Sequence, residues 1–541
     1  MQTIATRPFD DQKPGTSGLR KRVSRFREPH YLENFVQALF DCVDVPEDGL
    51  LVVGGDGRYH NDVAIQAILR IAAANGVGRI MVGQGGIFST PAVSHAIRLH
   101  GAFGGIILSA SHNPGGPDGD FGIKFNGANG GPAPEAVTDA VFARTKEIDA
   151  YRMADADPID LSALGEARVG ETIVSVIDPV GDYAELMTRL FDFAAIRALF
   201  ESGFRFRFDA MHAVTGPYAV RIFSELLGAP RETMLNAVPK ADFGGGHPDP
   251  NRVHAAHLFE ATTGPDAVDL ACASDGDGDR NLVVGRDCFV APSDSLAVLA
   301  ANLHLCPGYE DGLVGAARSM PTSGAVDRVA EAKGVAAYET PTGWKFFGTL
   351  LDAGRINICG EESAGTGSDH VREKDGLWAV LAWLNVLAVR GESVLAVMQD
   401  HWRTYGRNYY VRHDYEEVDA DAAARLMDGL RAQLPELAGR AMRAGTIERA
   451  DEFGYTDPVD GSEARRQGLR VIYADGSRLV FRLSGTGTVG ATIRVYLERY
   501  EGPDGDLEQG IEEALAPLVA DAEQLAGLRA ATGKERPDVV T

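Results

Sequence analysis

Residues 50–108 read LLVVGGDGRYHNDVAIQAILRIAAANGVGRIMVGQGGIFSTPAVSHAIRLHGAFGGIIL. Three short apolar runs, at 50–54, 79–83 and 105–108, predict buried strands. The two longer segments between them carry apolar residues at helical spacing, at 61–75 and 91–100. This β-α-β-α-β order predicts a mostly parallel sheet with helices on both faces.

The same kind of pattern returns twice farther along the chain, over 204–273 and 312–359. Each repeat ends in an apolar strand that runs into a small polar loop. The three ends read IILSASHNP from Ile106, DLACASDGDGD from Asp269 and INICGEES from Ile356. Because ligands of open α/β sheets bind beyond the carboxyl ends of strands, we expect these three loops to contribute to one site.

The last part of the chain has a different pattern. Residues 468–484 alternate between apolar and polar around an Asp-Gly turn, 491–500 alternate again, and 507–528 have helical spacing. The final dozen residues are polar and predict a loose tail.

A length of 541 residues suggests about three or four domains. The patterns together predict an α/β protein with three similar mixed α/β domains and a smaller α+β C-terminal domain. We expect the domains at 1–183, 184–297, 298–404 and 405–541.

The overall charge is strongly acidic, since 52 Lys and Arg face 77 Asp and Glu for a net charge of −25. This balance argues against nucleic acid or an anionic membrane as a partner. The best apolar run, 377–389, is well short of the ~20 residues that a membrane span needs. No apolar core stands at 1–15, and the five Cys lie at neither metal nor redox spacing, so we expect a cytoplasmic protein. An anionic substrate would need a local basic pocket.

Residues 275–280 read DGDGDR, in which three carboxylates alternate with Gly. Close carboxylates repel each other unless a cation neutralises them. An EF-hand is excluded, because its sixth and twelfth positions require Gly and Glu, and here they are Arg280 and Arg286. The pattern predicts a short Mg²⁺ loop that leaves room for a phosphate.

Residues 109–116 read SASHNPGG after a predicted buried strand, and seven Gly follow between 115 and 131. We expect a long loop here, with a serine that is either a nucleophile carrying a transferred group or a loop residue without a catalytic role.

Residues 485–490 formally match G-x-G-x-x-G, yet the following segment alternates like a strand, which excludes a dinucleotide fingerprint. The run at 482–488 instead offers a guanidinium, hydroxyls and backbone N–H groups that suit a phosphate. The alternative is a plain Gly-rich hairpin loop.

Taken together, the motifs resemble the α-D-phosphohexomutase superfamily and, within it, the phosphoglucomutase family. The resemblance runs in order along nearly the whole chain. Its motifs are KPGTSGLRKRV at 13–23, SASHNPGG at 109–116, DGDGDR at 275–280, TPTGWKFF at 340–347, GEES at 360–363, SDHVREKDGL at 368–377 and RLSGTGT at 482–488. Two small departures are Ala364, where relatives often carry an aromatic residue, and Thr488, where Ser is frequent.

The resemblance implies four domains around a central cleft and a role for each matched residue. It implies Ser111 as phosphoryl carrier, Lys124 or His112 as general base, and Arg20 as a further catalytic residue. The implied metal ligands are Ser111, Asp275, Asp277 and Asp279. The implied substrate-binding residues are Thr16, Ser17, Arg20, Asp279, Arg280, Thr342, Gly343, Glu361, Ser363, Lys374, Arg482, Ser484, Thr486 and Arg494.

The implied reaction is the reversible interconversion of α-D-glucose 1-phosphate and glucose 6-phosphate through a phosphoserine enzyme. Mg²⁺ and glucose 1,6-bisphosphate, as activator and intermediate, are the implied cofactors. Small sugar phosphates are the expected partners of a monomer or weak homo-oligomer. The alternatives are a mannose- or glucosamine-phosphate mutase on the same scaffold and a non-catalytic sugar-phosphate-binding relative.

Overall fold

The computed structural model describes residues 1–15, 17–484 and 490–541. These residues form two compact units. The first unit combines Met1–Gly315 with Gly343–Leu395, and the second combines Ala316–Thr342 with Ala396–Thr541. The four-domain boundaries expected from the sequence stay a prediction.

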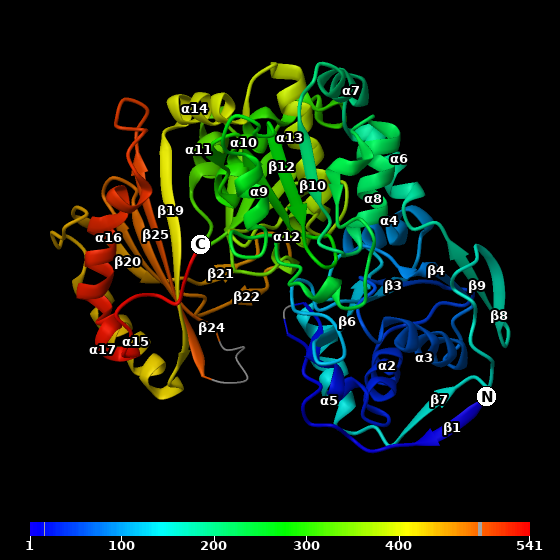
Figure 1. The fold of residues 1–541 in the computed structure, drawn as a ribbon. Helices are drawn as coiled ribbons and strands as arrows, with labels where there is room; N and C mark the ends of the chain where they lie inside the picture. The colour runs from blue at the N-terminus through cyan, green and yellow to red at the C-terminus, as the bar shows by residue number, and fades with distance from the viewer. Residues whose placement is uncertain (16, 485–489) are drawn as a thin grey trace. The chain divides into compact units, whose positions relative to one another are not determined.

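The 50–108 stretch forms the predicted β-α-β-α-β unit at the centre of a seven-stranded sheet (Figure 1). The sheet is mixed and not mostly parallel as expected, because antiparallel strands join both of its edges. The central strands pair in parallel and the outer strands pair antiparallel. In spatial order they are β2 (Leu19–Arg22), β6 (Asp120–Gly127), β5 (Gly104–Leu108), β3 (Leu50–Gly55), β4 (Arg79–Ile87), β9 (Thr172–Ile177) and β8 (Gly165–Val169). The two predicted helices are α3 (Asn61–Ala74) and α4 (Thr90–His100).

Strand β6 corrects the expectation of one long loop over 115–131. Phe121 and Ile123 alternate as buried strand residues, a period that the intervening glycines obscured. Gly122 is required there, because a Cβ at this position would lie 2.1 Å from the Ser109 carbonyl oxygen.

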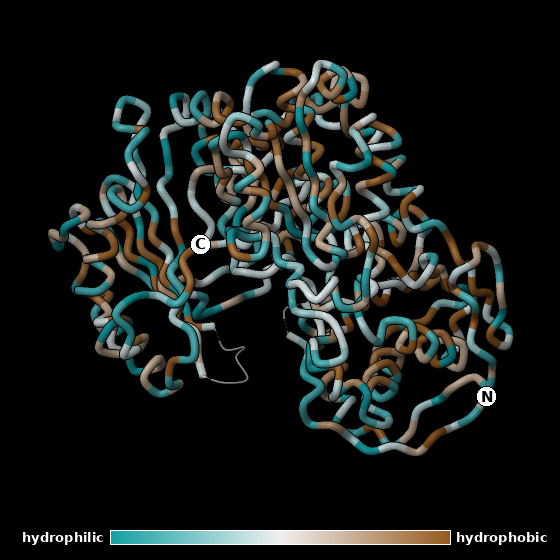
Figure 2. Tube along the Cα trace, viewed as in Figure 1, coloured by the Kyte–Doolittle hydropathy of each residue, from teal (hydrophilic) through white to brown (hydrophobic). Residues whose placement is uncertain are grey.

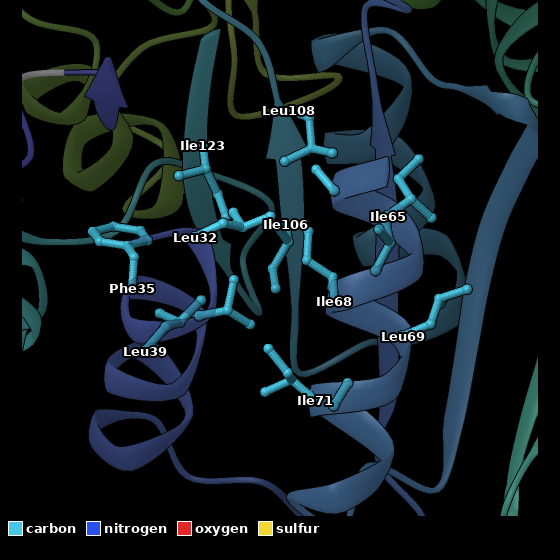
Figure 3. Packing of buried hydrophobic residues seen from close by; sticks show 14 of the residues in the cluster. Leu32, Phe35, Leu39, Ile65, Ile68, Leu69, Ile71, Ile106, Leu108 and Ile123 are labelled. Carbon is cyan, nitrogen blue, oxygen red and sulfur yellow. The ribbon is translucent and has the colours of Figure 1, made fainter. Parts of the chain in front are cut away.

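The core of this region lies between the sheet and helices α2 (Tyr31–Cys42) and α3. Figure 3 shows Leu39 of α2 and Ile68 of α3 turned toward Ile106 of β5. All three side chains are buried. This packing holds the carboxyl end of β5, and so the loop that follows it.

Two smaller sheets carry the other two polar loops, each loop between two antiparallel strands. One is mixed, with the order β11 (Met234–Leu235), β10 (Phe206–Asp209), β12 (Leu270–Ser274), β13 (Asn281–Gly285) and β14 (Cys288–Phe289). In the other, β17 (Ile358–Gly360) pairs antiparallel with β18 (Thr366–Ser368), and α13 (Gly376–Arg390) follows.

The remaining helices and strands complete the chain. They are β1 (Gln2–Ala5), α1 (Val23–Phe26), α5 (Glu135–Thr145), β7 (Ala150–Met153), α6 (Gly181–Leu190), α7 (Phe193–Glu201), α8 (Thr215–Ala219), α9 (Ala256–Ala261), α10 (Pro292–Asn302), β15 (Gly315–Ser319), α11 (Ala325–Lys333), β16 (Ala336–Thr340), α12 (Lys345–Asp352), α14 (Val394–Tyr405), β21 (Tyr455–Thr456) and β22 (Glu463–Ala464).

The second unit contains an antiparallel sheet against which α15 (Ala420–Gln433) and α16 (Ile511–Ala526) pack (Figure 1). Figure 2 shows hydrophobic stretches along its strands. Its order is β20 (Ile447–Glu452), β23 (Leu469–Tyr473), β24 (Arg478–Ser484), β25 (Ala491–Glu501), β19 (Arg407–Val418) and β26 (Val539–Val540).

Two predictions for this region have different outcomes. The hairpin is confirmed, with Gly476 at a φ of 85° in its turn. The loose tail is wrong, because α17 (Leu528–Thr532) continues the helical segment and Val540 pairs with His413 of β19. Backbone pairing at a sheet edge orders these residues despite their polar composition.

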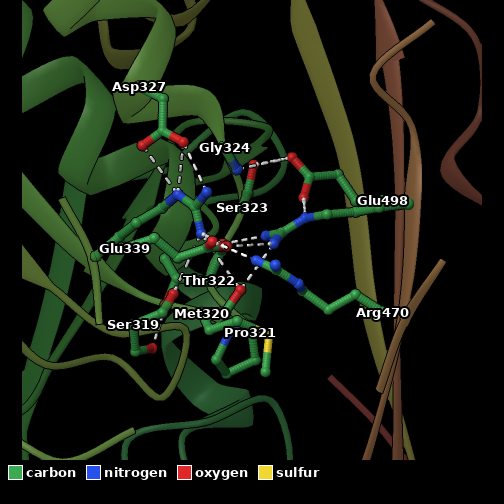
Figure 4. A network of polar contacts seen from close by, with 12 residues as sticks. Ser319, Met320, Pro321, Thr322, Ser323, Gly324, Asp327, Glu339, Arg470 and Glu498 are labelled. Atoms are coloured by element: carbon green, nitrogen blue, oxygen red, sulfur yellow. Dashed lines mark hydrogen bonds and ion pairs between the residues drawn. The ribbon is translucent and has the colours of Figure 1, made fainter. Parts of the chain in front are cut away.

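A partly buried charge network joins 316–342 to this sheet within the second unit (Figure 4). Glu339 lies among three guanidinium groups: its Oε1 is 3.0 Å from Arg318 Nη1 and 3.4 Å from Arg478 Nη1, and its Oε2 contacts Arg470. Glu498 of β25 accepts hydrogen bonds from Arg478 Nε and Ser323 Oγ, at 2.5 and 2.7 Å. We call Arg318, Asp327, Glu339, Arg470, Arg478 and Glu498 the Glu339 network.

Among the described residues, no single helix is long and apolar enough to cross a membrane. Helices α13 and α14 meet the length and composition test only when taken together across an 86° bend. Residues 376–387 of α13 are buried within the protein.

Candidate active site

Ser111 lies in the loop directly after β5, almost fully buried and with a φ of 51°. Such a left-handed backbone costs a non-glycine residue about 1–3 kcal/mol and persists only where the surroundings impose it. Here the Ser111 N–H donates to Ser109 Oγ at 2.7 Å, and Arg58 Nη2 donates to the Ser111 carbonyl oxygen at 2.7 Å.

Arg58 and Asp56, which the sequence analysis did not single out, support this loop. Both follow β3, which neighbours β5 in the sheet. Arg58 Nε is 2.9 Å from Asp56 Oδ2, and Ser109 Oγ donates to the same carboxylate oxygen at 2.7 Å. Their place at the carboxyl end of a predicted parallel strand is the signal that would have identified them.

The three carboxylates of the DGDGDR loop converge between β12 and β13. Asp275, Asp277 and Asp279 are buried, and one carboxylate oxygen of each lies within 4.8 Å of the others. Ser111 Oγ donates to Asp275 Oδ2 at 2.7 Å. The structure therefore brings together all four predicted metal ligands.

The electrostatics of this cluster fit a cation. Burial and repulsion from Asp279 and Asp277 raise the pKa of Asp275 well above its usual value. Burial also opposes ionisation of Asp277, but Lys124 and a hydrogen bond from Thr90 lower its pKa below the usual value.

Two carboxylate oxygens of the cluster, Asp277 Oδ1 and Asp279 Oδ1, are buried without a hydrogen-bond partner among the described residues. Oxygen donors of this kind are the ligands that Mg²⁺ takes. The residues present therefore fit a hard divalent cation.

Two buried lysines border the aspartates. Lys124 Nζ, on β6, lies 3.6 Å from Asp277 Oδ2 and 3.4 Å from Glu373 Oε1. Lys374 Nζ lies 3.1 Å from Asp279 Oδ2. Burial favours the neutral amines, yet the neighbouring carboxylates outweigh it and raise the pKa of both lysines.

His112, the other predicted general base, lies with Nδ1 3.4 Å from Ser111 Oγ. Its pKa is well below the usual value, mainly because Arg280 is nearby and also because the ring is buried. His112 and Lys124 therefore flank the same serine and metal-ligand cluster, in opposite charge states.

Two arginines bring positive charge to the cluster. The Nε atoms of Arg20, on β2, and of Arg280 are buried without a hydrogen-bond partner in the described parts of the chain. Arg280 Nη1 is 3.7 Å from Asp249 Oδ1. Burial lowers the pKa of Arg20, against the opposing effect of Asp277. Unpartnered guanidinium N–H groups suit a phosphate, which accepts several hydrogen bonds.

The GEES loop is tied directly to the metal loop. The Asn281 N–H donates to the Ala364 carbonyl oxygen at 3.0 Å. Glu361, buried beside it, accepts from the Gly343 N–H at 3.0 Å, and burial raises its pKa. Ser363 is half-buried in the same loop. The structure thus brings Glu361, Ser363 and Gly343 to the region expected to bind the sugar.

The predicted distal-phosphate residues lie in the second unit. Arg482 of β24 and Arg494 of β25 are direct cross-strand partners, and Ser484 pairs with Thr492 on the same strands. Like charges placed directly opposite destabilise a sheet by about 0.2–1 kcal/mol. Among the described residues, a carboxylate that offsets them is that of Asp414, whose Oδ2 is 3.6 Å from Arg494 Nε. A bound anion would relieve the repulsion.

For the other predicted site residues, the structure gives only the burial or no description. Ser17 is half-buried just before β2, and Thr342 is half-buried in the second unit. Thr16 and Thr486 lie outside the described residues, as does the centre of the RLSGTGT run. The strand predicted after that run is confirmed as β25, which agrees with the exclusion of a dinucleotide fingerprint.

Comparison with known proteins gives the same assignment along the whole chain. The family models for the α/β/α domains I, II and III of phosphoglucomutase/phosphomannomutase match residues 11–152, 182–287 and 292–405. The model for the phosphoglucomutase-1 C-terminal domain matches 407–538.

Full-length relatives are closely similar. The chain is 58% identical to a phosphoglucomutase of Rhizobium radiobacter, over 100% of both chains. It is 52% identical to human phosphoglucomutase-1, over 100% of this chain and 99% of the human one. The crystal structure of the phosphoglucomutase pp63/parafusin from Paramecium, in an open form, is 47% identical, with a TM-score of 0.93 and coverage of 100% and 99%.

Proposed function

The chain belongs to the phosphoglucomutase family, and we propose that Ser111 is the phosphoryl carrier of its mutase reaction. The protein is an enzyme, an isomerase that moves a phosphoryl group on a sugar phosphate. The observation that carries the proposal is the position of Ser111 Oγ, 2.7 Å from Asp275 Oδ2 beside the three buried carboxylates.

We assign the reaction to α-D-glucose 1-phosphate and glucose 6-phosphate. Phospho-Ser111 donates its phosphoryl group to the free sugar hydroxyl: the Oγ–P bond breaks, the new O–P bond forms, and the hydroxyl proton passes to a base. The bisphosphate then presents its other phosphoryl group, which returns to Ser111 by the reverse step. Positioning and charge neutralisation dominate this kind of transfer.

The metal in this proposal is Mg²⁺, held by Asp275, Asp277, Asp279 and the oxygen on Ser111. A bound divalent cation neutralises phosphoryl oxygens and stabilises the leaving oxygen. The unpartnered oxygens of Asp277 and Asp279 support this assignment. Arg20 and Arg280, each with a buried Nε that lacks a partner, add positive charge around the transferred group.

Two residues remain candidates for the base that takes the sugar proton. His112 Nδ1 is 3.4 Å from Ser111 Oγ, whereas Lys124 Nζ lies between Asp277 and Glu373. A base must come within hydrogen-bond reach of the hydroxyl whose proton it takes. Comparing His112→Gln and Lys124→Met in single turnover, with transfer from phospho-Ser111 as the readout, separates the two roles.

We assign the sugar hydroxyls to Glu361 and Ser363, with Thr342, Gly343 and Lys374 as further contacts. Arg482, Ser484, Thr486 and Arg494 hold the phosphate that is not transferred, and Thr16 and Ser17 are further substrate-binding residues. The opposed pair Arg482 and Arg494 supports the anion assignment. Comparing turnover of the glucose, mannose and glucosamine phosphates tests the choice of sugar.

We also propose a cytoplasmic enzyme that acts on small sugar phosphates as a monomer or weak homo-oligomer. The net charge of −25 and the small number of cysteines, five in 541 residues at neither metal nor redox spacing, support this setting.

Intact mass is the test of the carrier. The protein should gain the mass of one phosphoryl group on exposure to glucose 1,6-bisphosphate and lose it to glucose 6-phosphate. Ser111→Ala should abolish both the added mass and turnover, while Ser162→Ala, at an exposed serine, should change neither. Full turnover by Ser111→Ala would refute the proposal.

A further inference from the structure

A second buried polar cluster lies next to the active site without taking part in the proposed chemistry. It contains Ser368, His370 and Asp375, with Tyr183, Tyr309 and Trp378 around them, all within the first unit. The side chain of His370 is 1% exposed and that of Asp375 is 0% exposed. We call these six residues the His370 relay.

The indole of Trp378 sets the direction of the hydrogen bonds that run through Tyr309 and Ser368 to His370. An indole N–H only donates, so Tyr309 accepts from Trp378 Nε1, at 2.8 Å, and passes its own hydrogen to Ser368. The Ser368 hydroxyl then donates to His370 Nδ1, at 2.6 Å.

His370 completes the relay through its two ring nitrogens. With Nδ1 accepting, its proton is on Nε2, which donates to Asp375 Oδ2 at 2.9 Å. The other oxygen of Asp375 accepts from Tyr183 at 2.7 Å and from the Trp378 N–H at 3.0 Å. The relay therefore begins and ends on Trp378, and both Asp375 oxygens are hydrogen-bonded.

Between His370 and Asp375 in the sequence lie two residues that contact the active site, Glu373 and Lys374. Glu373 accepts from Asn126 Nδ2 at 2.9 Å and faces Lys124, and Lys374 Nζ lies 3.1 Å from Asp279 Oδ2. One residue after Asp375, the Gly376 N–H donates to the Gly278 carbonyl oxygen at 3.0 Å.

The backbone of Gly376 lies so close to the metal loop that no larger residue fits there. A Cβ there would lie 2.1 Å from the Arg280 carbonyl oxygen, so the first residue of α13 packs directly on the metal loop. Asp375 caps that same helix through its bond from Trp378 N. Any shift of Asp375 would move both Lys374 and the backbone that supports residues 278–280.

We propose that the His370 relay is a positioning device for the metal loop, which keeps Lys374 on Asp279 and the start of α13 on Gly278. The inference rests on the proposed function, because it takes the DGDGDR loop as the metal site. Groups that orient metal ligands from behind typically change metal affinity or activity by about 10–100-fold when they are lost. Since the relay acts through Lys374 and Gly376, we expect the lower end of that range.

The test compares two Tyr→Phe variants of the full-length protein. Tyr309→Phe removes the hydroxyl that links Trp378 to Ser368. Tyr473→Phe is the matched control: its buried phenol donates to Asp521 Oδ2 at 2.9 Å in the second unit, far along the chain from the relay. Both variants lose one buried hydroxyl, so similar losses of thermal stability are expected.

The deciding readouts are Mn²⁺ affinity, measured by electron paramagnetic resonance, and the separate values of kcat and KM. Tyr309→Phe should bind Mn²⁺ about tenfold more weakly and lower kcat more than it raises the KM for glucose 1-phosphate. Tyr473→Phe should match the wild type in all three. His370→Gln, which keeps an N–H for Asp375, should retain more Mn²⁺ affinity than His370→Ala.

Two results would overturn the inference. If Tyr309→Phe matches Tyr473→Phe in Mn²⁺ affinity and kcat while the wild type binds and turns over normally, the relay is only a folding element and the proposed function stands. If the wild type itself neither binds Mn²⁺ nor turns over glucose 1-phosphate, the proposed function fails and this inference fails with it.

Discussion

Glu339→Gln should destabilise the second unit by about 3 kcal/mol. Burial raises the pKa of Glu339, but the guanidinium groups of Arg318, Arg478 and Arg470 outweigh it and lower the pKa from 4.5 to about 2. Each pKa unit corresponds to about 1.4 kcal/mol, which gives the estimate. This estimate agrees with the about 3–5 kcal/mol that the loss of one member of a buried ion pair typically costs.

Differential scanning calorimetry of the full-length protein measures this effect. A loss of about 3 kcal/mol lowers the melting temperature of a unit of this size by about 6–12 °C. Glu448→Gln is the control, because it removes the same charge from an exposed position on β20. We expect it to leave the transition within about 2 °C of the wild type.

The pH dependence provides a second check with a defined sign. The pKa of Glu339 is lower in the folded protein than in the unfolded chain, so its contribution is fully present above about pH 4.5 and is lost as the pH falls through about 2. At about pH 3 the difference between wild type and Glu339→Gln should shrink to roughly half. Equal melting temperatures for Glu339→Gln and Glu448→Gln, or a difference independent of pH, would refute the reasoning.

Three further predictions concern the active site. Gly276→Ala would place a Cβ 2.3 Å from the Ser111 carbonyl oxygen, so kcat should fall by about 10²-fold; normal turnover would contradict the packing. Arg482→Ala should raise the KM about tenfold and lower kcat without loss of thermal stability, because it relieves repulsion with Arg494; an unchanged KM would argue against the anion site. Exhaustive chelation should abolish turnover until Mg²⁺ is restored, and full activity of the chelated protein in a steady-state assay would remove the metal from the reaction.

The sequence predicted those parts of the site that depend on local order. Ser111 and the three aspartates follow apolar strands, and their neighbours in sequence identify them. The hydrogen-bond partners of these residues were not predicted, because they are distant in the sequence. Thr90 donates to Asp277 across 187 residues, and Arg58 donates to Ser111 across 53. Local periodicity carries no information about such pairings, because only the folded sheet order brings them together.

In the fold, too, elements with a clear local pattern were predicted and elements that depend on distant partners were not. Helix α3 and the strands beside it follow from apolar spacing within 50–108. Strand β6 was missed because the glycines around Phe121 and Ile123 indicate a loop by composition, although close packing requires Gly122. Strand β26 was missed because two residues pair only with the distant β19.

The Glu339 network has a consequence for the order in which the chain matures during synthesis. Glu339 contacts Arg470 across 131 residues, and Ser323 contacts Glu498 across 175. A ribosome therefore completes 316–342 long before the arginines and the carboxylate that enclose it exist. Until then Glu339 and Ser323 lack these partners, although the neighbouring residues 343–395 of the first unit are already made. A chain that still lacks its last residues exposes surface that the complete chain covers, and such surface is what chaperones bind. A fragment that begins at 405 would carry Arg470 and Arg478 with no Glu339 to receive them.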